Sequence, residues 1–413
     1  MKVKLKEIIS DFIVPMRDKP KVFDGSIPWC RIEDISGKYL IDSKSNQRVS
    51  NETVKKMGLK VYPINTLLFS CSATIGVTAI TKAPLCTNQT FIGLFPGPNL
   101  DVEFLYYYLG KIGSRQRQAA SITTIPYLSR RFFEELVINL PTKLSEQKKI
   151  SAVLASLDSK IELNNRINIE LETIAKTLYD YWFVQFDFPN KNGKPYKSSG
   201  GKMVWNEDLK REIPEGWEVK SIDECCKIVD CLHSKKPEMK FEREEFYLLQ
   251  LENILDNGLV DISNKYFVSQ NDYFKWTSRI EVKENDILIT NAGRVAANAQ
   301  IPKEIVTGIG RNITAIRPDS ISPTYLFQSF RGVDILKQIK SNTDSGAFFQ
   351  SFNVKGIKRL KFLIPENTIE NKFEQLAYSW RRKRELNLAE NQKLASLRDW
   401  LLPMLMNGQV KVN

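Results

Sequence analysis

The sequence predicts an α+β protein of two similar domains separated by an antiparallel pair of long helices, a coiled coil, with an internal pseudo-twofold repeat. Three observations predict this fold class: a long heptad pattern after residue 144, a similar pattern after residue 368, and a collinear match between the segments that precede them. The expected boundaries are 1–143 for the first domain, 144–188 for the central helix, 189–212 for a linker, 213–367 for the second domain and 368–413 for the C-terminal helix.

The first domain is expected to mix short strands with helices. Strands are predicted around 28–32, 65–70, 90–95 and 136–140, because β-branched and aromatic residues there are bounded by turn residues. A short helix is predicted over 102–109, where Tyr106, Tyr107 and Tyr108 lie among apolar neighbours. The three tyrosines are therefore expected in the core rather than as a platform for stacking bases.

The central helix is predicted from a heptad seam. Apolar or helix-tolerant residues recur in alternating steps of four and three, with two asparagines in the middle, at Ile150, Leu154, Leu157, Ile161, Asn164, Asn168, Leu171, Ala175, Leu178 and Trp182. Such a stripe lets a helix pack along a partner helix. Proline and glycine are absent from 144–188, and Pro189 with the following turn residues ends the segment.

The partner helix is predicted in the same chain, because residues 370–402 repeat the seam at an offset of 223. The matched pairs are Ile150 and Phe373, Leu157 and Trp380, Asn164 and Asn387, Asn168 and Asn391, Leu171 and Leu394, Ile174 and Leu397, and Leu178 and Leu401. Asparagines in an apolar seam are a device that fixes register. An antiparallel return predicts Asn164 beside Asn391 and Asn168 beside Asn387; the alternative is a solvated helix against an ordinary core.

The second domain repeats the first. The sequence Glu7-Ile8-Ile9 matches Glu224-Cys225-Cys226 at an offset of 217, and the offset grows by small steps to 224 at Pro141 and Pro365. A steadily growing offset is what a few loop insertions in a duplicated unit would produce.

Composition limits the class of protein. The 413 residues carry a net charge of +12, with 42% hydrophobic and 26% charged residues, and no apolar run approaches the length of a membrane span. The basic excess favours a polyanionic partner. The N-terminus lacks a secretory signal, so we expect a cytoplasmic protein without membrane attachment, in which the six cysteines are free thiols.

No catalytic, cofactor-binding or metal-binding residue is predicted. Phosphate-loop and dinucleotide-binding patterns are absent, and His233 is the only histidine. Cys225, Cys226, Cys231 and His233 are close enough in sequence to suggest zinc, but the repeat aligns them with Ile8, Ile9, Val14 and Met16. Residues that exchange with apolar ones are expected to be buried structural residues. Acid-x-Lys triplets at 238–240 and 281–283 leave a magnesium-dependent nuclease as an alternative.

Polar residues in the predicted loops suit nucleic acid, since Arg and Lys reach phosphates and Arg, Lys, Asn and Gln can read base edges. The candidates for DNA binding in the first half are Arg17, Lys19, Lys21, Ser72, Thr74, Asn88, Gln89, Tyr127, Ser129 and Arg130. In the second half they are Lys235, Lys236, Asn291, Arg294, Arg311, Asn312, Gln350, Ser351, Asn353 and Lys355. For any single residue, the alternative is a solvated surface loop.

The order of these features resembles the specificity subunit of type I restriction–modification systems. The resemblance rests on the helix start Leu144-Ser145-Glu146-Gln147-Lys148-Lys149-Ile150, on Tyr181-Trp182-Phe183-Val184-Gln185-Phe186-Asp187-Phe188-Pro189, and on Ile213-Pro214-Glu215-Gly216-Trp217, each followed by a domain or helix in the family's order. It covers essentially the whole chain.

The resemblance implies a non-catalytic subunit with two target-recognition domains, each reading one half of a split site in double-stranded DNA. It implies that the helix pair acts as a spacer and as a dock for two methyltransferase (modification) subunits, with restriction subunits in the larger complex. Methyl donor and ATP would belong to those partners. The competing functions are a stand-alone magnesium-dependent nuclease and a coiled-coil scaffold that binds only proteins.

Overall fold

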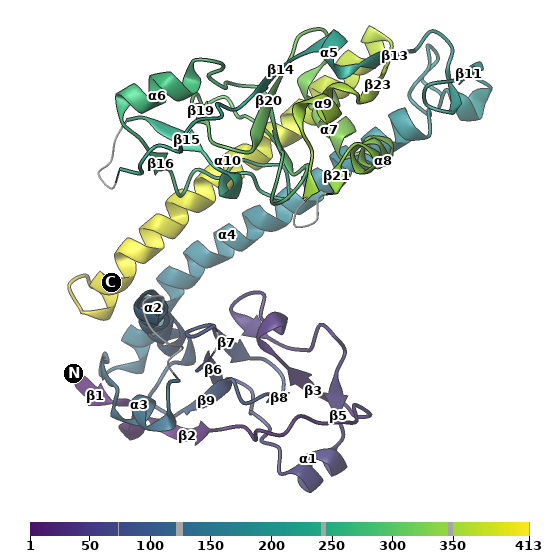
Figure 1. The fold of residues 1–413 in the computed structure, drawn as a ribbon. Helices are drawn as coiled ribbons and strands as arrows, with labels where there is room; N and C mark the ends of the chain where they lie inside the picture. The colour runs from purple at the N-terminus through teal and green to yellow at the C-terminus, as the bar shows by residue number, and fades with distance from the viewer. Residues whose placement is uncertain (73, 121–126, 241–244, 346–349, 413) are drawn as a thin grey trace. The chain divides into compact units, whose positions relative to one another are not determined.

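The computed structural model describes residues 1–72, 74–120, 127–240, 245–345 and 350–412 (Figure 1). The chain forms two compact units: unit 1 contains residues 1–160 and 393–413, and unit 2 contains residues 161–392. Each unit joins one globular part to a stretch of both long helices, α4 (Leu144–Tyr179) and α10 (Asn367–Met406).

The main sheet of unit 1 has five strands in the order β2-β9-β6-β7-β4. Their bounds are β2 Ile9–Ile13, β9 Phe91–Pro96, β6 Leu67–Ser70, β7 Thr78–Thr81 and β4 Tyr39–Leu40. The first four pair antiparallel, and β4 is parallel to β7. Every residue of β6 is buried, because Leu67 and Phe69 face one hydrophobic cluster and Leu68 faces another.

Smaller elements complete unit 1. A three-stranded sheet has the order β5-β3-β8, and β1 pairs with β10 just before α4 begins. The bounds are β1 Lys2–Lys4, β3 Ile27–Cys30, β5 Arg48–Val49, α1 Asn51–Met57, β8 Cys86–Thr87, α2 Val102–Ala120, α3 Arg130–Glu135 and β10 Val137–Asn139. The core cluster that covers one face of the main sheet includes Phe104 and Leu105 of α2, Phe133 of α3 and Leu154 of α4.

Unit 2 repeats this plan, with four strands in the main sheet as described where unit 1 has five. Its main sheet has the order β14-β20-β17-β18, its small sheet has the order β16-β15-β19, and β13 pairs with β23 just before α10. The bounds are β13 Glu218–Ser221, α5 Ile222–Cys225, β14 Cys226–Asp230, β15 Tyr247–Leu249, β16 Tyr266–Phe267, α6 Gln270–Thr277, β17 Ile287–Thr290, β18 Asn298–Gln300, β19 Gly308–Ile309, β20 Ile313–Pro318, α7 Pro323–Phe330, α8 Val333–Ser341, β21 Asp344–Ser345, β22 Gln350–Ser351, α9 Val354–Lys358 and β23 Lys361–Ile364. Four of the five strands of the main sheet in unit 1, and all three strands of the small sheet, recur in the same order in unit 2, which confirms the predicted duplication.

One predicted helix differs in length between sequence and structure. The helix expected over 102–109 continues as α2 to Ala120, through Gly110 and Gly113. Gly113 does not end the helix; it allows close packing, because a Cβ there would lie 2.6 Å from the Cα of Gly76. In unit 2 the corresponding stretch is divided into α7 and α8 at Arg331 and Gly332.

The predicted linker is partly folded. Residues 189–212 were expected to be irregular, but β11 (Met203–Asn206) forms an antiparallel hairpin with β12 (Arg211–Pro214). Before the hairpin, Phe188 stacks on Trp217 with ring centroids 4.9 Å apart, and Phe186 meets the same indole edge-on at 5.7 Å. The aromatic sequence after α4 therefore packs into the hydrophobic core of unit 2.

The two long helices pair antiparallel within each unit. In unit 2, Nδ2 of Asn164 lies 2.9 Å from Oδ1 of Asn391, and Nδ2 of Asn387 lies 2.8 Å from Oδ1 of Asn168. In unit 1, Nη1 of Arg398 lies 2.8 Å from Oδ1 of Asp158. The structure thus contains both predicted asparagine pairs. The second helix was expected over 368–413; α10 begins at Asn367, continues through Pro403 and ends at Met406.

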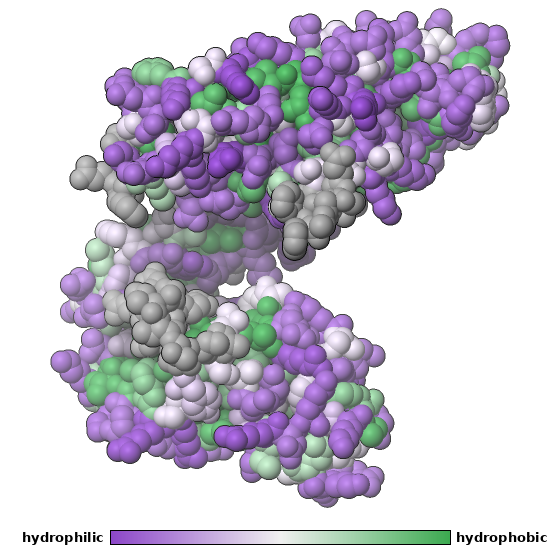
Figure 2. Space-filling model, viewed as in Figure 1, coloured by the Kyte–Doolittle hydropathy of each residue, from purple (hydrophilic) through white to green (hydrophobic). Residues whose placement is uncertain are grey.

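The face drawn in Figure 2 is mainly hydrophilic, with scattered apolar side chains. Among the described residues, no helix is both long enough and apolar enough to cross a membrane.

Candidate nucleic-acid interface

Three loops of unit 1 meet at one end of its main sheet. Strand β6 ends at Ser70, which pairs with Phe91 at the start of β9, so the loops after β6 and before β9 share this edge. The backbone N–H of Cys71 donates to Thr90 O at 2.6 Å, and that of Leu128 donates to Cys71 O at 3.1 Å. These bonds bring the candidates of three segments together: Ser72, Thr74, Asn88, Gln89, Tyr127, Ser129 and Arg130.

The side chains at this edge, called edge 1 here, are accessible in most cases. Thr74, Gln89, Tyr127, Ser129 and Arg130 are exposed, and Ser72 and Asn88 are half-buried. Three of the seven also make contacts within unit 1, and one of them is Arg130, whose Nε lies 2.7 Å from Oε1 of Glu134. The Ser129 hydroxyl accepts from the Phe132 amide at the start of α3, and Oδ1 of Asn88 accepts from the Thr90 hydroxyl at 2.6 Å.

The basic loop of unit 1 leaves the sheet at the same end. Strand β2 ends at Ile13, opposite Gly93 of β9, and the exposed residues Arg17, Lys19 and Lys21 follow it. The ammonium of Lys19 lies 5.9 Å from the ring centroid of Trp29. Edge 1 therefore combines cations that can contact phosphates with amide and hydroxyl groups that can contact bases.

Unit 2 builds a corresponding edge 2. Thr290 at the end of β17 pairs with Ile313 at the start of β20. The amide of Asn291 donates to Asn312 O, and that of Phe352 donates to Asn291 O, both at 2.8 Å. The same three segments thus meet by equivalent backbone bonds in both units.

The candidates at edge 2 differ in their exposure and in the contacts that they make within unit 2. Lys235, Lys236, Arg311, Asn312, Asn353 and Lys355 are exposed, and Ser351 is half-buried. Nδ2 of Asn291 donates to Oγ1 of Thr314 at 2.9 Å and to Phe352 O at 3.1 Å. The Arg294 guanidinium contacts Oδ1 of Asp256 at 2.6 Å and the carbonyls of Leu251 and Ile254, so it also anchors the 251–256 turn. Gln350 lies in β22, and its side chain is outside the described residues.

The comparisons with known proteins point to one family. Residues 3–173 match the type I restriction modification DNA specificity domain. Along nearly its full length, the chain is similar to the MjaIX type I restriction enzyme specificity subunit of Methanocaldococcus jannaschii, with 26% identity over 99% of this chain and 93% of the relative. It is also 23% identical to the HindI specificity subunit of Haemophilus influenzae, over 70% of this chain and 72% of that one.

Residues 3–173 carry the type I restriction modification DNA specificity domain, and nearly the whole chain is similar to a type I specificity subunit. The fold of the chain is similar to the crystal structure of a type I restriction–modification system S subunit from M. genitalium, with a TM-score of 0.56, 17% identity, and coverage of 98% of this chain and 96% of that chain.

The sequence at the start of α4 that resembles specificity subunits has a structural role in unit 1. Gln147 is fully buried, and its Oε1 accepts from the Asp101 amide at 2.8 Å while its Nε2 donates to Asn99 O at 3.0 Å. In unit 2, Glu370 takes the corresponding position on α10 and accepts from the Ser322 amide. This side chain therefore ties the start of each long helix to the segment that opens α2 or α7.

The helix pair of unit 2 contains ion pairs where the seam departs from apolar residues. Arg384 stands where the first helix has Ile161, and it is only 3% exposed. Its Nη2 lies 2.9 Å from Oε2 of Glu172 and 2.7 Å from Asn257 O, and Glu172 also binds Arg331. Burial lowers the pKa of Arg384, and the carboxylate of Glu172 opposes that effect.

The two repeats align differently near His233 in the structure than the sequence predicts. The register shifts between Ile9 and Asp11 in β2, where the strand has a bulge, whereas β14 runs without one. Beyond the bulge, Asp230 therefore corresponds to Val14, Cys231 to Pro15 and His233 to Arg17. Sequence alone did not reveal the bulge, because a one-residue slip in a short strand changes no recognisable motif.

The cysteines fit the expectation of buried thiols, but His233 does not fit the expectation of burial. All six cysteines are free and buried, and burial raises the pKa of Cys30, Cys71, Cys86 and Cys226 to about 12. The His233 side chain is 64% exposed and lies at edge 2. Potential ligand atoms of Asp230, Cys231 and His233 lie within 4.8 Å of one another.

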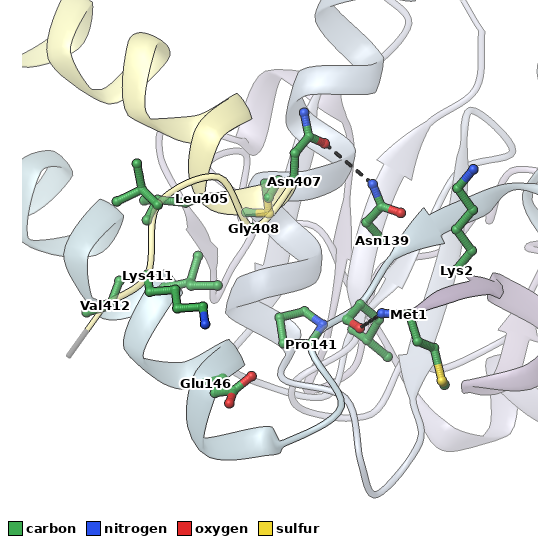
Figure 3. Close-up of a pocket in the computed structure, with 14 residues that line it drawn as sticks. Met1, Lys2, Asn139, Pro141, Glu146, Leu405, Asn407, Gly408, Lys411 and Val412 are labelled. Atoms are coloured by element: carbon green, nitrogen blue, oxygen red, sulfur yellow. Dashed lines mark hydrogen bonds between the residues drawn. The ribbon is translucent and has the colours of Figure 1, made fainter.

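A cavity of about 490 Å³ lies in unit 1 away from edge 1 (Figure 3). Met1, Pro141, Glu146, Leu405 and Lys411 are among its lining residues, and the terminal ammonium of Met1 donates to Leu140 O at 2.8 Å. In unit 2, Phe186, Phe188 and Trp217 are members of the hydrophobic core.

Proposed function

We propose that this chain is the non-catalytic DNA-recognition subunit of a type I restriction–modification complex. Residues 1–143 and 213–367 would be its target-recognition domains, each reading one half of a split site in double-stranded DNA. The observation that carries this proposal is the recurrence of edge 1 and edge 2 at the same end of the same sheet, each with exposed cationic and amide side chains. Such a combination suits phosphate contact and base reading.

The proposed partners follow from the duplication. A chain that presents equivalent segments twice can hold two copies of one partner, here two methyltransferase subunits, with restriction subunits in the larger complex. Apolar side chains are exposed at matching positions of the two long helices: Leu163 and Leu386 are 47% and 48% exposed, and Ile174 and Leu397 are 45% and 42% exposed. Exposed apolar groups on a helix pair favour docking of protein. The methyl donor and ATP would be bound by those partners, and the complex would act in the cytoplasm.

Methylome sequencing of cells that express the chain with its methyltransferase tests the proposal. We expect a split motif methylated in both halves. Exchange of residues 1–143 for the matching domain of a relative should change one half of that motif and leave the other intact. Simultaneous change of both halves would contradict the assignment of one domain to one half.

Two further measurements separate this function from the alternatives. Binding to DNA by the complex should weaken steeply as salt rises, because neutralised phosphates release counterions. A scaffold that binds only proteins would show no such slope, because it would not bind DNA at all. Magnesium-dependent cutting by the purified chain alone would favour the nuclease. The structure gives Glu281 of one acid-x-Lys triplet another role, since its Oε1 accepts from the Tyr273 hydroxyl at 2.6 Å.

A further inference from the structure

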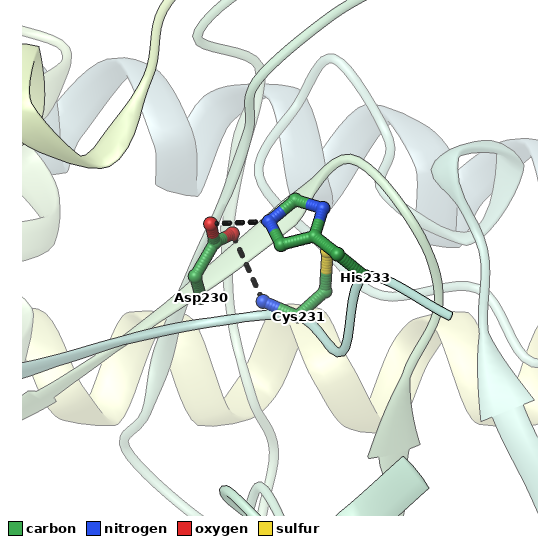
Figure 4. Close-up of side chains that lie close together, drawn as sticks. All are labelled: Asp230, Cys231 and His233. Carbon is green, nitrogen blue, oxygen red and sulfur yellow. Dashed lines mark hydrogen bonds and ion pairs between the residues drawn. The ribbon is translucent and has the colours of Figure 1, made fainter.

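Edge 2 contains a hydrogen-bonded chain that ends on the only histidine of the sequence (Figure 4). Asp230 is the last residue of β14, and its Oδ1 accepts from the Cys231 amide at 2.9 Å and the Thr314 hydroxyl at 3.3 Å. Its Oδ2 lies 2.8 Å from Nε2 of His233. Because Thr314 also accepts from Nδ2 of Asn291, the chain joins His233 to the centre of edge 2.

The contact with Asp230 determines which ring nitrogen carries a proton. A carboxylate only accepts hydrogen bonds, so Nε2 of His233 must donate to it. In the neutral ring, Nδ1 is then an acceptor. Among the described residues Nδ1 has no hydrogen-bond partner, and the side chain is 64% exposed. His233 thus offers an oriented acceptor at the edge where the proposed function places DNA.

Unit 1 shows that the fold does not require this chain of polar residues. The strand register places Val14, Ile92 and Cys71 of unit 1 where unit 2 has Asp230, Thr314 and Asn291. The position of His233 is taken by Arg17, an exposed residue that can only donate. The same fold therefore carries a hydrogen-bond donor at edge 1 and, at edge 2, an acceptor that Asp230 holds in place. This difference suits the reading of different bases.

We infer that His233, held by Asp230, is a specificity-determining residue that accepts a hydrogen bond from the exocyclic amino group of an adenine or cytosine in the second half-site. This inference rests on the proposed function. The amino groups of adenine and cytosine are the base donors displayed in the major groove, so an acceptor at edge 2 selects them over guanine and thymine. Asp230 is a positioning residue, because it acts through the ring of His233.

The test uses the full chain with its methyltransferase and reads the methylated motif by methylome sequencing. His233→Ala should leave the first half of the motif unchanged and make one position of the second half degenerate. Lys337→Gln, an exposed change on α8, is the matched control and should leave both halves unchanged. An unaltered motif with His233→Ala would overturn the inference, whereas absence of any split motif in the wild type would overturn the proposed function instead.

Asp230→Asn provides a sharper variant. The Asn oxygen should stay where Oδ1 accepts from the Cys231 amide, so that its NH₂ group faces His233. The ring would then accept at Nε2 and donate from Nδ1, and the preferred base should change from adenine or cytosine toward guanine or thymine, which display acceptors. A residue with only a structural role would lower the methylation rate without this exchange of bases; that result would contradict the role of Asp230.

Zinc is the remaining alternative for this cluster, because Asp230, Cys231 and His233 are all possible ligands. Dialysed protein, with and without added zinc, should contain no stoichiometric metal, and chelator should not alter the methylated motif. Retained zinc, together with a chelator effect equal to that of His233→Ala, would replace the inference with a metal site. Thermal unfolding of each variant shows whether it is folded. If His233→Ala does not fold, Asp230→Asn provides the test of the inference in its place.

Discussion

Asn168 and Asn387 face each other within the helix pair of unit 2, with Nδ2 of Asn387 2.8 Å from Oδ1 of Asn168. Both are at least nine-tenths buried, at 7% and 1% exposure. A buried amide pair stabilises one register of a helix pair because a slipped register would leave each amide without its partner.

Asn168→Leu alone should destabilise the protein. It would leave the Asn387 amide buried without this partner, at a cost of about 1–3 kcal/mol. The double variant Asn168→Leu with Asn387→Leu should recover most of that loss, since both polar groups are then absent. Denaturant unfolding measures the cycle, with exposed Ile169→Ala as the control. Equal destabilisation by the single and double variants would argue against a coupled pair.

Glu172→Ala should lower the stability of the fold more than the loss of a surface charge does. Arg384 would remain buried without its carboxylate, and breaking such a pair costs about 3–5 kcal/mol. Adding Arg384→Ile, the residue type of position 161, should restore much of the stability because no buried charge remains. Thermal unfolding of the two variants, with exposed Glu162→Ala as the control, provides the measurement. The expectation fails if Glu172→Ala behaves like Glu162→Ala.

Acid should weaken one contact in unit 1 over a defined range. Hydrogen bonds from Lys4 and Lys6 lower the pKa of Glu135 to about 2 from its ordinary value of 4.5. A carboxyl group whose pKa is lowered by folding stabilises the folded state at pH values above 4.5. This contribution is lost as the pH falls toward about 2. The stability difference between wild type and Glu135→Gln should therefore be largest above pH 4.5 and vanish near pH 2. Glu135 is exposed, so the effect should be small, and a pH-independent difference would contradict it.

Gly113→Ala should destabilise unit 1 although alanine favours helices. The added methyl would lie 2.6 Å from the Cα of Gly76, and relief of such overpacking costs about 1–3 kcal/mol. Gly110→Ala on the same helix is the control, because its Cβ would meet only Oγ1 of Thr78, at 3.8 Å. That control should be neutral or more stable by up to about 1 kcal/mol. Equal effects of the two changes in denaturant unfolding would show that α2 can move away from Gly76.

The features set by periodicity could be predicted from sequence. The duplication and the pairing of Asn164 with Asn391 both follow from matches repeated along the chain. The meeting of three loop segments at edge 1 and edge 2 was expected only as a set of polar loops, because the backbone bonds of Cys71 and Asn291 join residues far apart in sequence.

Features set by single tertiary contacts could not be predicted in the same way. The helix predicted over 102–109 continues through Gly113, and the contact of Gly113 with Gly76 explains this glycine by packing. The bulge in β2 hid the correspondence of His233 with Arg17. The buried Arg384 weakened the predicted seam, because its partner Glu172 lies on the other helix, far away in sequence.

The burial of all six cysteines has a practical consequence. Thiolate is the form that reacts with maleimide, and burial holds these thiols protonated and out of contact with the reagent. A cysteine introduced at exposed Gln89 or Arg311 would then react first in the folded protein, so the six native cysteines need not be removed beforehand. A fluorophore attached there would report DNA engagement by one recognition edge at a time.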